Sequence, residues 1–209
     1  MTSDCIPVIA AIVLAAGSSR RFGAENKLLV EIDARPLVTR VIEAIEAAGI
    51  TRVIVVTGHE QELIEAATAK PGRRLIHNDR HGEGMGASVA VGVAALDDEV
   101  DGVLIAQGDM PAIDAKLVAN LRQHFIESGC DGVVFPRLAD GRQGNPVIWP
   151  KRLFGHLSAL TGDKGGKRLI EAEGERAISV AVTGDRASAD IDTPEELAAY
   201  LAARSSQPS

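Results

Sequence analysis

Short apolar runs alternate with amphipathic stretches along most of the chain. Runs rich in Val, Ile, Leu and Ala predict strands at residues 8–15, 52–58, 73–77, 102–109, 132–136, 145–150 and 179–183. Apolar positions at helical spacing predict helices at residues 36–49, 60–69, 86–96, 115–129 and 193–203. This alternation of strand and helix with short connections is typical of an α/β fold.

The residue types in these runs favour a mostly parallel sheet with helices on both faces, which makes three layers. Aromatic residues are only 3% of the chain, so the core must be aliphatic, as suits parallel strands buried on both faces. No repeat, linker or low-complexity block interrupts the pattern. We therefore expect a single domain over residues 1–209, with 202–209 as a frayed tail.

Loops that follow strands are the places to look for chemistry, because open α/β sheets bind ligands at the carboxyl ends of their strands. Four such loops are rich in small and charged residues, and the segment 141–146 is a fifth candidate; the four are 15–27, 77–88, 107–111 and 184–193. The last loop leads into a clear helix start. Thr193 can cap that helix, Pro194 suits its first turn, and Glu196 completes a capping box.

Composition and charge exclude several classes of protein. The 209 residues are 45% hydrophobic and 24% charged, as in ordinary globular proteins. The formal net charge of -7 disfavours a nucleic-acid partner, so any anion site must be local. Cys5 and Cys130 form no C-x-x-C pair, which favours a reduced interior. No long apolar run or secretory signal is present, so we expect a cytoplasmic protein without membrane contact.

The first loop combines small side chains with positive charge. Its small residues leave backbone N–H groups accessible to an anion, and its cations can offset the charge of a polyphosphate. The candidate phosphate-binding residues are Leu14, Ala15, Ala16, Gly17, Ser18, Ser19, Arg20, Arg21 and Lys27. A solvated basic turn would have a similar sequence. The loop matches neither the P-loop nor the G-x-G-x-x-G fingerprint of dinucleotide-binding folds.

Carboxylates follow two of the other strands. Asp109 comes directly after an apolar run, where it could be a ligand for Mg²⁺ or could simply make the turn before Pro111. Asp190 and Asp192 share one face of an extended segment, with Ile191 pointing inward. Asp192 could instead serve only as a helix cap.

Together these segments resemble the nucleotidyltransferase superfamily that includes the sugar-phosphate and molybdopterin nucleotidyltransferases. LAAGSSRRFG with its downstream lysine is similar to the superfamily's signature loop. QGDMP and DIDTPEEL are similar to its two metal-site segments. The resemblance implies a Rossmann-like, nucleotide-diphospho-sugar-transferase type of fold. It also implies catalytic residues Arg21, Lys27 and Asp109, and Mg²⁺ as a cofactor held by Asp109 together with Asp190 or Asp192.

Within the superfamily the chain is most similar to the molybdenum cofactor cytidylyltransferases, which are relatives of the molybdopterin guanylyltransferases. GEGMGASVAVGV resembles their base-facing loop, which implies nucleotide contacts from Gly84, Gly86 and Ser88. GRQGNPVIW and TGDKGGKRLI resemble their acceptor-side segments, which implies acceptor binding by Arg142, Gly144, Asn145, Lys164, Lys167 and Arg168. Asn145 stands where a histidine is often found, and TGDKGGKRLI also fits a basic turn that opens a helix.

The implied reaction transfers CMP from CTP to the phosphate of a molybdopterin-type acceptor and releases pyrophosphate. GTP as the donor and a different acceptor stay open, since proteins named for purine catabolism or nicotine-pigment reduction share much of the pattern. A NAD(P)-dependent oxidoreductase would need the missing glycine fingerprint. A binding or maturation protein for molybdoenzymes would lack the metal carboxylates, although maturation proteins remain candidate partners.

The histidines show no spacing typical of metal ligands. We expect all five to be ordinary surface or turn residues: His59, His77, His81, His124 and His156.

Overall fold

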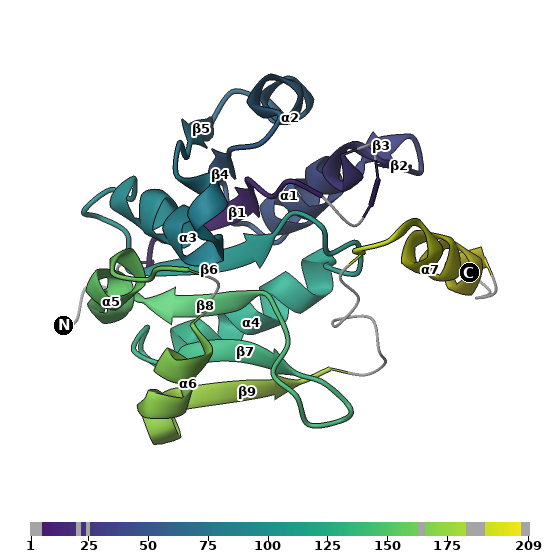
Figure 1. Ribbon diagram of the computed structural model, residues 1–209. Helices are drawn as coiled ribbons and strands as arrows, with labels where there is room; N and C mark the ends of the chain where they lie inside the picture. Colours follow the sequence, from purple (N-terminus) through teal and green to yellow (C-terminus); the bar gives the residue numbers. More distant parts are fainter. Residues whose placement is uncertain (1–5, 20–21, 24–25, 163–165, 183–190, 206–209) are drawn as a thin grey trace.

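The computed structural model describes residues 6–19, 22–23, 26–162, 166–182 and 191–205, and it confirms the mostly parallel α/β architecture (Figure 1). A seven-stranded sheet has the order β5-β4-β1-β6-β8-β7-β9, and β8 runs antiparallel to both of its neighbours. The strands are β1 (Ile9–Ala15), β4 (Arg52–Thr57), β5 (Arg73–His77), β6 (Gly102–Gln107), β7 (Val133–Arg137), β8 (Val147–Pro150) and β9 (Ala177–Ala181). Each corresponds to a predicted strand.

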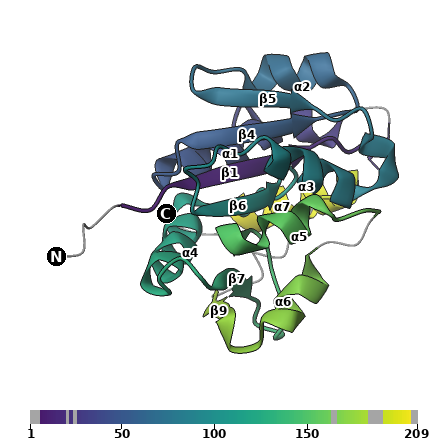
Figure 2. The ribbon, with the colours of Figure 1, turned by 90° about the vertical axis from the view of Figure 1, so that its left-hand side faces the viewer.

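Helices cover both faces of the sheet (Figures 1 and 2). They are α1 (Leu37–Ala47), α2 (Gln61–Thr68), α3 (Met85–Ala94), α4 (Ala115–Glu127), α5 (Phe154–Ser158), α6 (Lys167–Glu173) and α7 (Pro194–Ser205). All five predicted helices are present. The pattern did not predict α5, α6 or a small hairpin of β2 (Glu31–Ile32) and β3 (Arg35–Pro36), although TGDKGGKRLI also fits a turn that opens a helix. Residues 202–205, expected in a frayed tail, form the last turn of α7.

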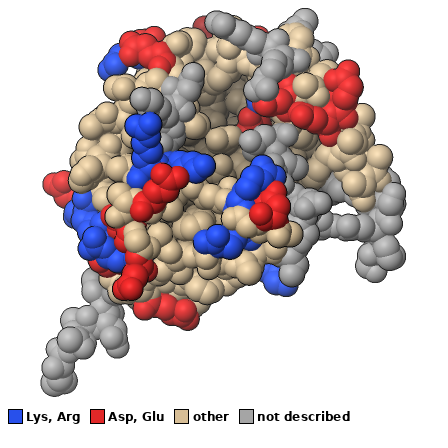
Figure 3. Space-filling view, turned by 60° about the horizontal axis from the view of Figure 1, so that its bottom comes forward, with Lys and Arg blue, Asp and Glu red and all other residues tan. Residues whose placement is uncertain are grey.

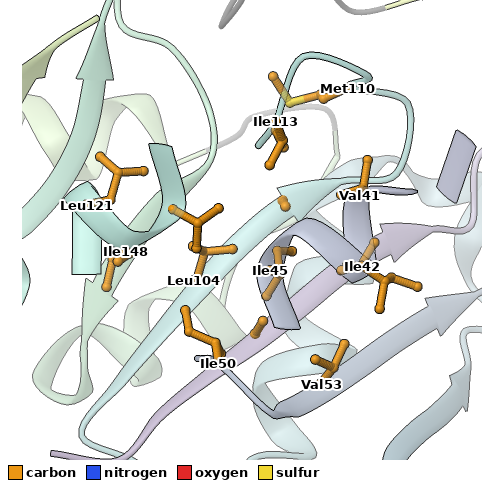
Figure 4. Close-up of a cluster of buried hydrophobic side chains, with 14 of the residues drawn as sticks. Val41, Ile42, Ile45, Ile50, Val53, Leu104, Met110, Ile113, Leu121 and Ile148 are labelled. Atoms are coloured by element: carbon orange, nitrogen blue, oxygen red, sulfur yellow. The ribbon is translucent and has the colours of Figure 1, made fainter. Parts of the chain in front are cut away.

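Two apolar clusters occupy the two sides of the sheet. Alternate residues of β1 enter different clusters, since Val13 belongs to the one and Ile12 to the other, and both side chains are fully buried. The first cluster joins the sheet to α1, α2 and α4, and the second joins it to α3, α5 and α6. Figure 4 shows Val41, Ile42 and Ile45 of α1 beside Leu104 of β6. Aliphatic side chains on both faces therefore hold the strands whose ends carry the predicted chemistry.

A third, smaller cluster anchors the C-terminal segment beside the first loop. Phe22 and Ile191 are buried in this cluster, and Tyr200 of α7 packs against it. The Tyr200 hydroxyl donates to the Pro111 carbonyl oxygen at 2.9 Å, and the Ile191 N–H donates to the Asp109 carbonyl oxygen at 3.2 Å. These contacts bring residues 191–193 next to the end of β6, although the two segments are far apart in the sequence.

The capping box predicted for the last helix is confirmed. The Glu196 N–H donates to the Thr193 hydroxyl oxygen at 3.2 Å, and the Glu196 carboxylate accepts from the Thr193 N–H at 3.0 Å. Helix α7 therefore begins at Pro194, directly after the aspartate segment.

Charges of both signs are mixed on the molecular surface. On the face shown in Figure 3, Lys and Arg side chains lie beside Asp and Glu. Among the ion pairs of the described residues, Arg152 Nε lies 2.6 Å from Asp131 Oδ1. In the described part of the chain no helix has the length and apolar character needed to cross a membrane.

Candidate active site

The sheet brings the loops that follow four parallel strands to the same edge. Leu14 of β1 is in register with Gln107 of β6, and Ala15 of β1 is in register with Thr57 of β4. Thr57 is in turn in register with His77 of β5. The loops after β1, β4, β5 and β6 therefore leave the sheet side by side, as the position of ligand sites in open α/β sheets leads one to expect.

These loops enclose a cleft with a volume of about 940 Å³. It is lined by Leu14, Ala16, Gly17, Ser18, Ser19, Gly23, Lys27, Leu28, His59, His81, Gly82, Gly84, Met85, Ser88, Gln107, Asp109 and Asp192. Most of the predicted nucleotide-binding residues are thus gathered in one place. Ala15 is buried in the sheet, and Gly86 packs against residues 161–162. Arg20 and Arg21 lie outside the described residues.

Lys27 lies between two carboxylates at the end of β6. Its Nζ is 2.5 Å from Asp109 Oδ2 and 2.7 Å from Asp192 Oδ1. The Lys27 and Asp109 side chains are largely buried, at 13% and 14% exposure, whereas that of Asp192 is 27% exposed. Burial alone would lower the pKa of Lys27, but Asp109 and then Asp192 outweigh it and raise that pKa above its ordinary value. Lys27 is therefore a cation throughout the physiological pH range.

Asp109 and Asp192 suit a divalent cation. The Oδ1 of Asp109 is buried and has no hydrogen-bond partner among the described residues, which leaves its lone pairs available. Carboxylate oxygens are the ligands that Mg²⁺ prefers in proteins. The third predicted ligand, Asp190, lies outside the described residues. Within the described ranges, no group of three or more His, Cys, Asp or Glu residues is placed to hold a metal ion.

His59 and His81 lie in surface turns, as predicted, and both also line the cleft, which the sequence analysis did not predict. Their ring centroids lie 6.4 Å apart with the planes tilted by 48°. Gly58 explains how their loops meet, because a Cβ at that position would lie 2.7 Å from His81 Cβ and 2.9 Å from Ala16 Cβ. Histidine spacing along the chain could not reveal this placement.

Two buried asparagines that the sequence analysis missed organise the cleft loops. Asn78, after β5, donates through Nδ2 to Ser88 Oγ at 3.0 Å and accepts from the Arg80 N–H at 3.0 Å. Asn26, before Lys27, accepts from the Leu28 N–H at 3.0 Å. Both amides have only a few per cent of their surface exposed, and buried polar groups need such partners. The loops around the cleft are therefore fixed by internal hydrogen bonds.

The predicted acceptor residues lie on the β7–β8 connection and at the start of α6. Arg142 is exposed near the tip of that connection, where its Nε lies 2.5 Å from Asp140 Oδ2. None of the described members of the set lines the cleft: Arg142, Gly144, Asn145, Lys167 and Arg168. Lys164 lies outside the described residues. Their role in acceptor binding stays a prediction.

The segment that leads to α6 does touch the cleft wall. The Gly86 N–H at the start of α3 donates to the Gly162 carbonyl oxygen at 2.8 Å. A Cβ on Gly86 would lie 2.9 Å from both that oxygen and the Thr161 nitrogen, so only glycine permits this approach. The start of α3, which carries the cleft residues Met85 and Ser88, is thus packed directly on the turn before α6.

A small-residue loop, a lysine and strand-end aspartates at the carboxyl edge of a parallel sheet define a nucleotidyltransferase type of site. The chain belongs to the MobA-like NTP transferase domain family, whose sequence profile matches residues 11–177. Nucleotidyl transfer is the class of activity that this family and the structural neighbours below support.

Proteins with several different names are similar in sequence to this chain. Nicotine blue oxidoreductase of Paenarthrobacter nicotinovorans is 25% identical over 92% of this chain and 96% of that protein. Purine catabolism protein PucB of Bacillus subtilis (strain 168) is 28% identical over 91% of this chain and 94% of PucB. Bifunctional protein GlmU of Carboxydothermus hydrogenoformans is 32% identical over 59% of this chain but only 27% of GlmU. The chain thus spans less than a third of that GlmU.

Solved structures share the whole fold. Rv0371c from Mycobacterium tuberculosis H37Rv has a TM-score of 0.81 and 26% identity, covering 95% of this chain and 100% of its own. Its complex with manganese has a TM-score of 0.76 and 25% identity over 93% of this chain and 98% of its own. A nucleotidyl transferase from Methanothermobacter thermautotroptrophicus has a TM-score of 0.76 and 26% identity over 95% and 96%.

Proposed function

We propose that this protein transfers CMP from CTP to the phosphate of a molybdopterin-type acceptor. The observation that carries the proposal is the meeting of Lys27, Asp109 and Asp192 beside the small-residue loop in one cleft. An oxygen of the acceptor phosphate would attack the α-phosphorus of CTP. The bond from that phosphorus to the bridging oxygen would break, and pyrophosphate would leave with the electron pair.

The protein's part in this reaction is to align anions and offset their charge. Backbone N–H groups of residues 15–20 would hold the β- and γ-phosphates, and Arg21 would offset the charge that builds on the leaving group. Lys27, which keeps its proton, would reach the α-phosphate or the attacking phosphate. Gly84, Gly86 and Ser88 would contribute to the wall that meets the base.

The metal proposed for the site is Mg²⁺, held by Asp109 together with Asp190 or Asp192. When bound, it would neutralise phosphate oxygens around the reacting phosphorus. Support comes from the buried, unpartnered Oδ1 of Asp109. Because a structural neighbour was crystallised with manganese, Mn²⁺ belongs in the same tests.

Base and acceptor are the least constrained parts of the proposal. A base wall made largely of glycine and main-chain groups can match cytosine or, after a small shift, guanine. Arg142, Gly144, Asn145, Lys164, Lys167 and Arg168 would bind the acceptor. The similarity of GRQGNPVIW and TGDKGGKRLI to cytidylyltransferase segments favours CTP and molybdopterin. Molybdoenzyme maturation proteins are the macromolecular partners that such a product would require.

The deciding experiment measures pyrophosphate release with each of the four ribonucleoside triphosphates, Mg²⁺ or Mn²⁺, and molybdopterin or no acceptor. We expect release with CTP that depends on the acceptor. A tenfold preference for GTP, about 1.4 kcal/mol of transition-state discrimination, would assign the chain to guanylyl transfer instead. Pyrophosphate release that molybdopterin does not change would correct the acceptor alone. Failure with every triphosphate would overturn the proposal.

Oxidoreductase activity is a second candidate function, because one relative that this chain matches over nearly its full length is named nicotine blue oxidoreductase. A parallel arm therefore follows NADH and NADPH absorbance in the presence of quinonoid dyes. We expect no oxidation of either cofactor, since the first loop lacks the dinucleotide fingerprint. Steady oxidation without triphosphate consumption would favour the oxidoreductase alternative.

A further inference from the structure

A chain of polar side chains joins two of the cleft loops. Ser19 Oγ donates to Asn26 Oδ1 at 3.3 Å, and Asn26 Nδ2 donates to Glu60 Oε2 at 2.9 Å. Glu60 Oε2 also lies 3.9 Å from His59 Nε2. Ser19 and His59, the two ends of this chain, both line the cleft. The loop after β1 and the loop after β4 are thus connected through one amide and one carboxylate.

Asn26 also sets the start of the turn that carries Lys27. Its Oδ1 accepts from the Leu28 N–H at 3.0 Å and so caps the 3₁₀ turn η1 (Lys27–Leu29). The residue is only 6% exposed, and its amide has donor and acceptor bonds at once. A rotation of this side chain would therefore disturb Lys27 on one side and Glu60 on the other.

Both loops carry backbone strain at the points that Asn26 touches. Ser19 has a φ of 48° and Glu60 a φ of 52°, in the left-handed region that residues with a Cβ seldom adopt. Such conformations persist only where surrounding contacts over-determine them. Asn26 provides a contact to each of the two residues.

From these contacts we propose that Asn26, paired with Glu60, is a positioning residue that aligns Lys27 and His59 across the cleft. The inference rests on the proposed nucleotidyl transfer, because Lys27 acts on phosphate there. Asn26 itself need not touch substrate. It keeps the Lys27 ammonium at the carboxylates of Asp109 and Asp192 and keeps the His59 loop at its present distance.

The pairing can be tested by exchanging its polarity. In Asn26→Asp the carboxylate can still accept from Leu28 and Ser19, but it faces Glu60 with a like charge. In the double variant Asn26→Asp/Glu60→Gln the Gln amide can donate to the Asp carboxylate, which restores the bond in reverse. We expect Asn26→Asp to lower kcat by up to about 10²-fold, because small misplacements have such effects. The double variant should recover most of that loss.

A matched control makes the same change on the surface. Gln123→Glu places a carboxylate beside Glu127, with which Gln123 now forms an exposed 2.8 Å hydrogen bond on α4. We expect wild-type kcat from this variant and unchanged circular dichroism from all of them. The inference is overturned if Asn26→Asp keeps wild-type kcat, or if the double variant is no faster than Asn26→Asp.

A second measurement does not need activity. Hydrogen exchange in Asn26→Asp should speed up in peptides covering residues 26–30 and 58–64, and the double variant should restore protection there. If the wild-type protein turns over no triphosphate, the proposed function fails. The positioning role of Asn26 is then tested by hydrogen exchange alone. Unchanged exchange in both peptides would overturn that role whatever the activity.

Discussion

Asp109 is the residue on which most of the site depends. Its Oδ2 pairs with Lys27 at 2.5 Å, while its buried Oδ1 is left for a cation. Asp109→Asn keeps the shape and removes the charge, so we expect turnover to fall by about 10²-fold or more with an unchanged circular dichroism spectrum. The exposed Asp98→Asn is the matched control and should keep full activity. Asp109→Asn with more than a tenth of wild-type turnover would contradict the role as a metal ligand.

Lys27 should matter for a different reason, because its charge acts on phosphate. We expect Lys27→Met to slow turnover on the order of 10²–10³-fold, the usual effect of removing one transition-state donor. The residual reaction should also lose part of its sensitivity to salt, since one charge that salt can screen is gone. Steady-state kinetics at several ionic strengths measure both effects, with the exposed Lys116→Met as control. Equal rates in Lys27→Met and wild type would mean that the first loop is only a solvated basic turn without a role in turnover.

Residues whose chemistry follows from strand order could be predicted from the sequence. Asp109 follows β6 and Asp192 precedes α7, while Lys27 was predicted from the charge of the first loop and the family resemblance; the structure brings the three together. His59 and Asn26 could not be found this way. Their roles depend on how separate loops converge in space, and neither side chain is part of a spacing pattern.

At the scale of elements, the start of α3 depends on its contact with the turn before α6. Gly86→Ala would place a methyl group against backbone atoms of Thr161 and Gly162, which cannot rotate away. We expect a loss of about 1–3 kcal/mol in the free energy of unfolding, typical of overpacking. A raised KM for nucleotide should accompany it, because Gly84 and Ser88 at this end of α3 line the cleft.

Gly155→Ala is the matched control for this prediction. Gly155 lies within α5, and a Cβ there would have no heavy atom within 4 Å. Since alanine is a better helix former than glycine, we expect this variant to be unchanged or more stable by up to about 1 kcal/mol. Urea unfolding of both variants makes the comparison. Equal stability of Gly86→Ala and wild type would show that the α3 contact yields without strain.

The long, periodic elements were predictable, and the short ones were not. Alternation of aliphatic runs and amphipathic stretches predicted the seven strands of the sheet and five helices. The hairpin of β2 and β3 has two residues in each strand, too few to show a period of two. Helix α5 has only five residues. Helix α7 extends into the expected tail, as far as Ser205, and the tertiary contacts of Ile191 and Tyr200 that dock it cannot be predicted from periodicity.

At the scale of the whole molecule, one charged pair connects α1 to the edge strand β5. Arg73 Nε lies 2.7 Å from Glu46 Oε1, and the Arg73 side chain is only 4% exposed. Arg73 also donates to the Thr68 carbonyl oxygen at the end of α2, at 2.9 Å. Lys70 adds a second, exposed contact to Glu46 at 2.9 Å. This group therefore joins three elements at one edge of the sheet.

Protonation of Glu46 at low pH should weaken this pair and lower the free energy of unfolding of the whole protein. The hydrogen bond from Arg73, with a smaller one from Lys70, lowers the pKa of Glu46 from 4.5 to about 2 in the folded protein, although burial opposes the change. Because the folded pKa lies below the unfolded one, the pair's stabilisation is complete above about pH 4.5 and is lost as the pH falls toward 2. We expect about 1.5–3 kcal/mol to disappear over that window, the range for hydrogen bonds to charged groups.

Denaturant unfolding between pH 2 and 7 measures this loss, and Glu46→Gln isolates its source. The variant should be less stable than wild type near neutral pH, and the difference should shrink as acid protonates Glu46 in the wild type. The exposed Glu171→Gln should leave the wild-type pH profile in place. A gap between wild type and Glu46→Gln that stays constant down to about pH 2 would mean that the carboxylate's charge contributes nothing and that only packing at this edge is lost.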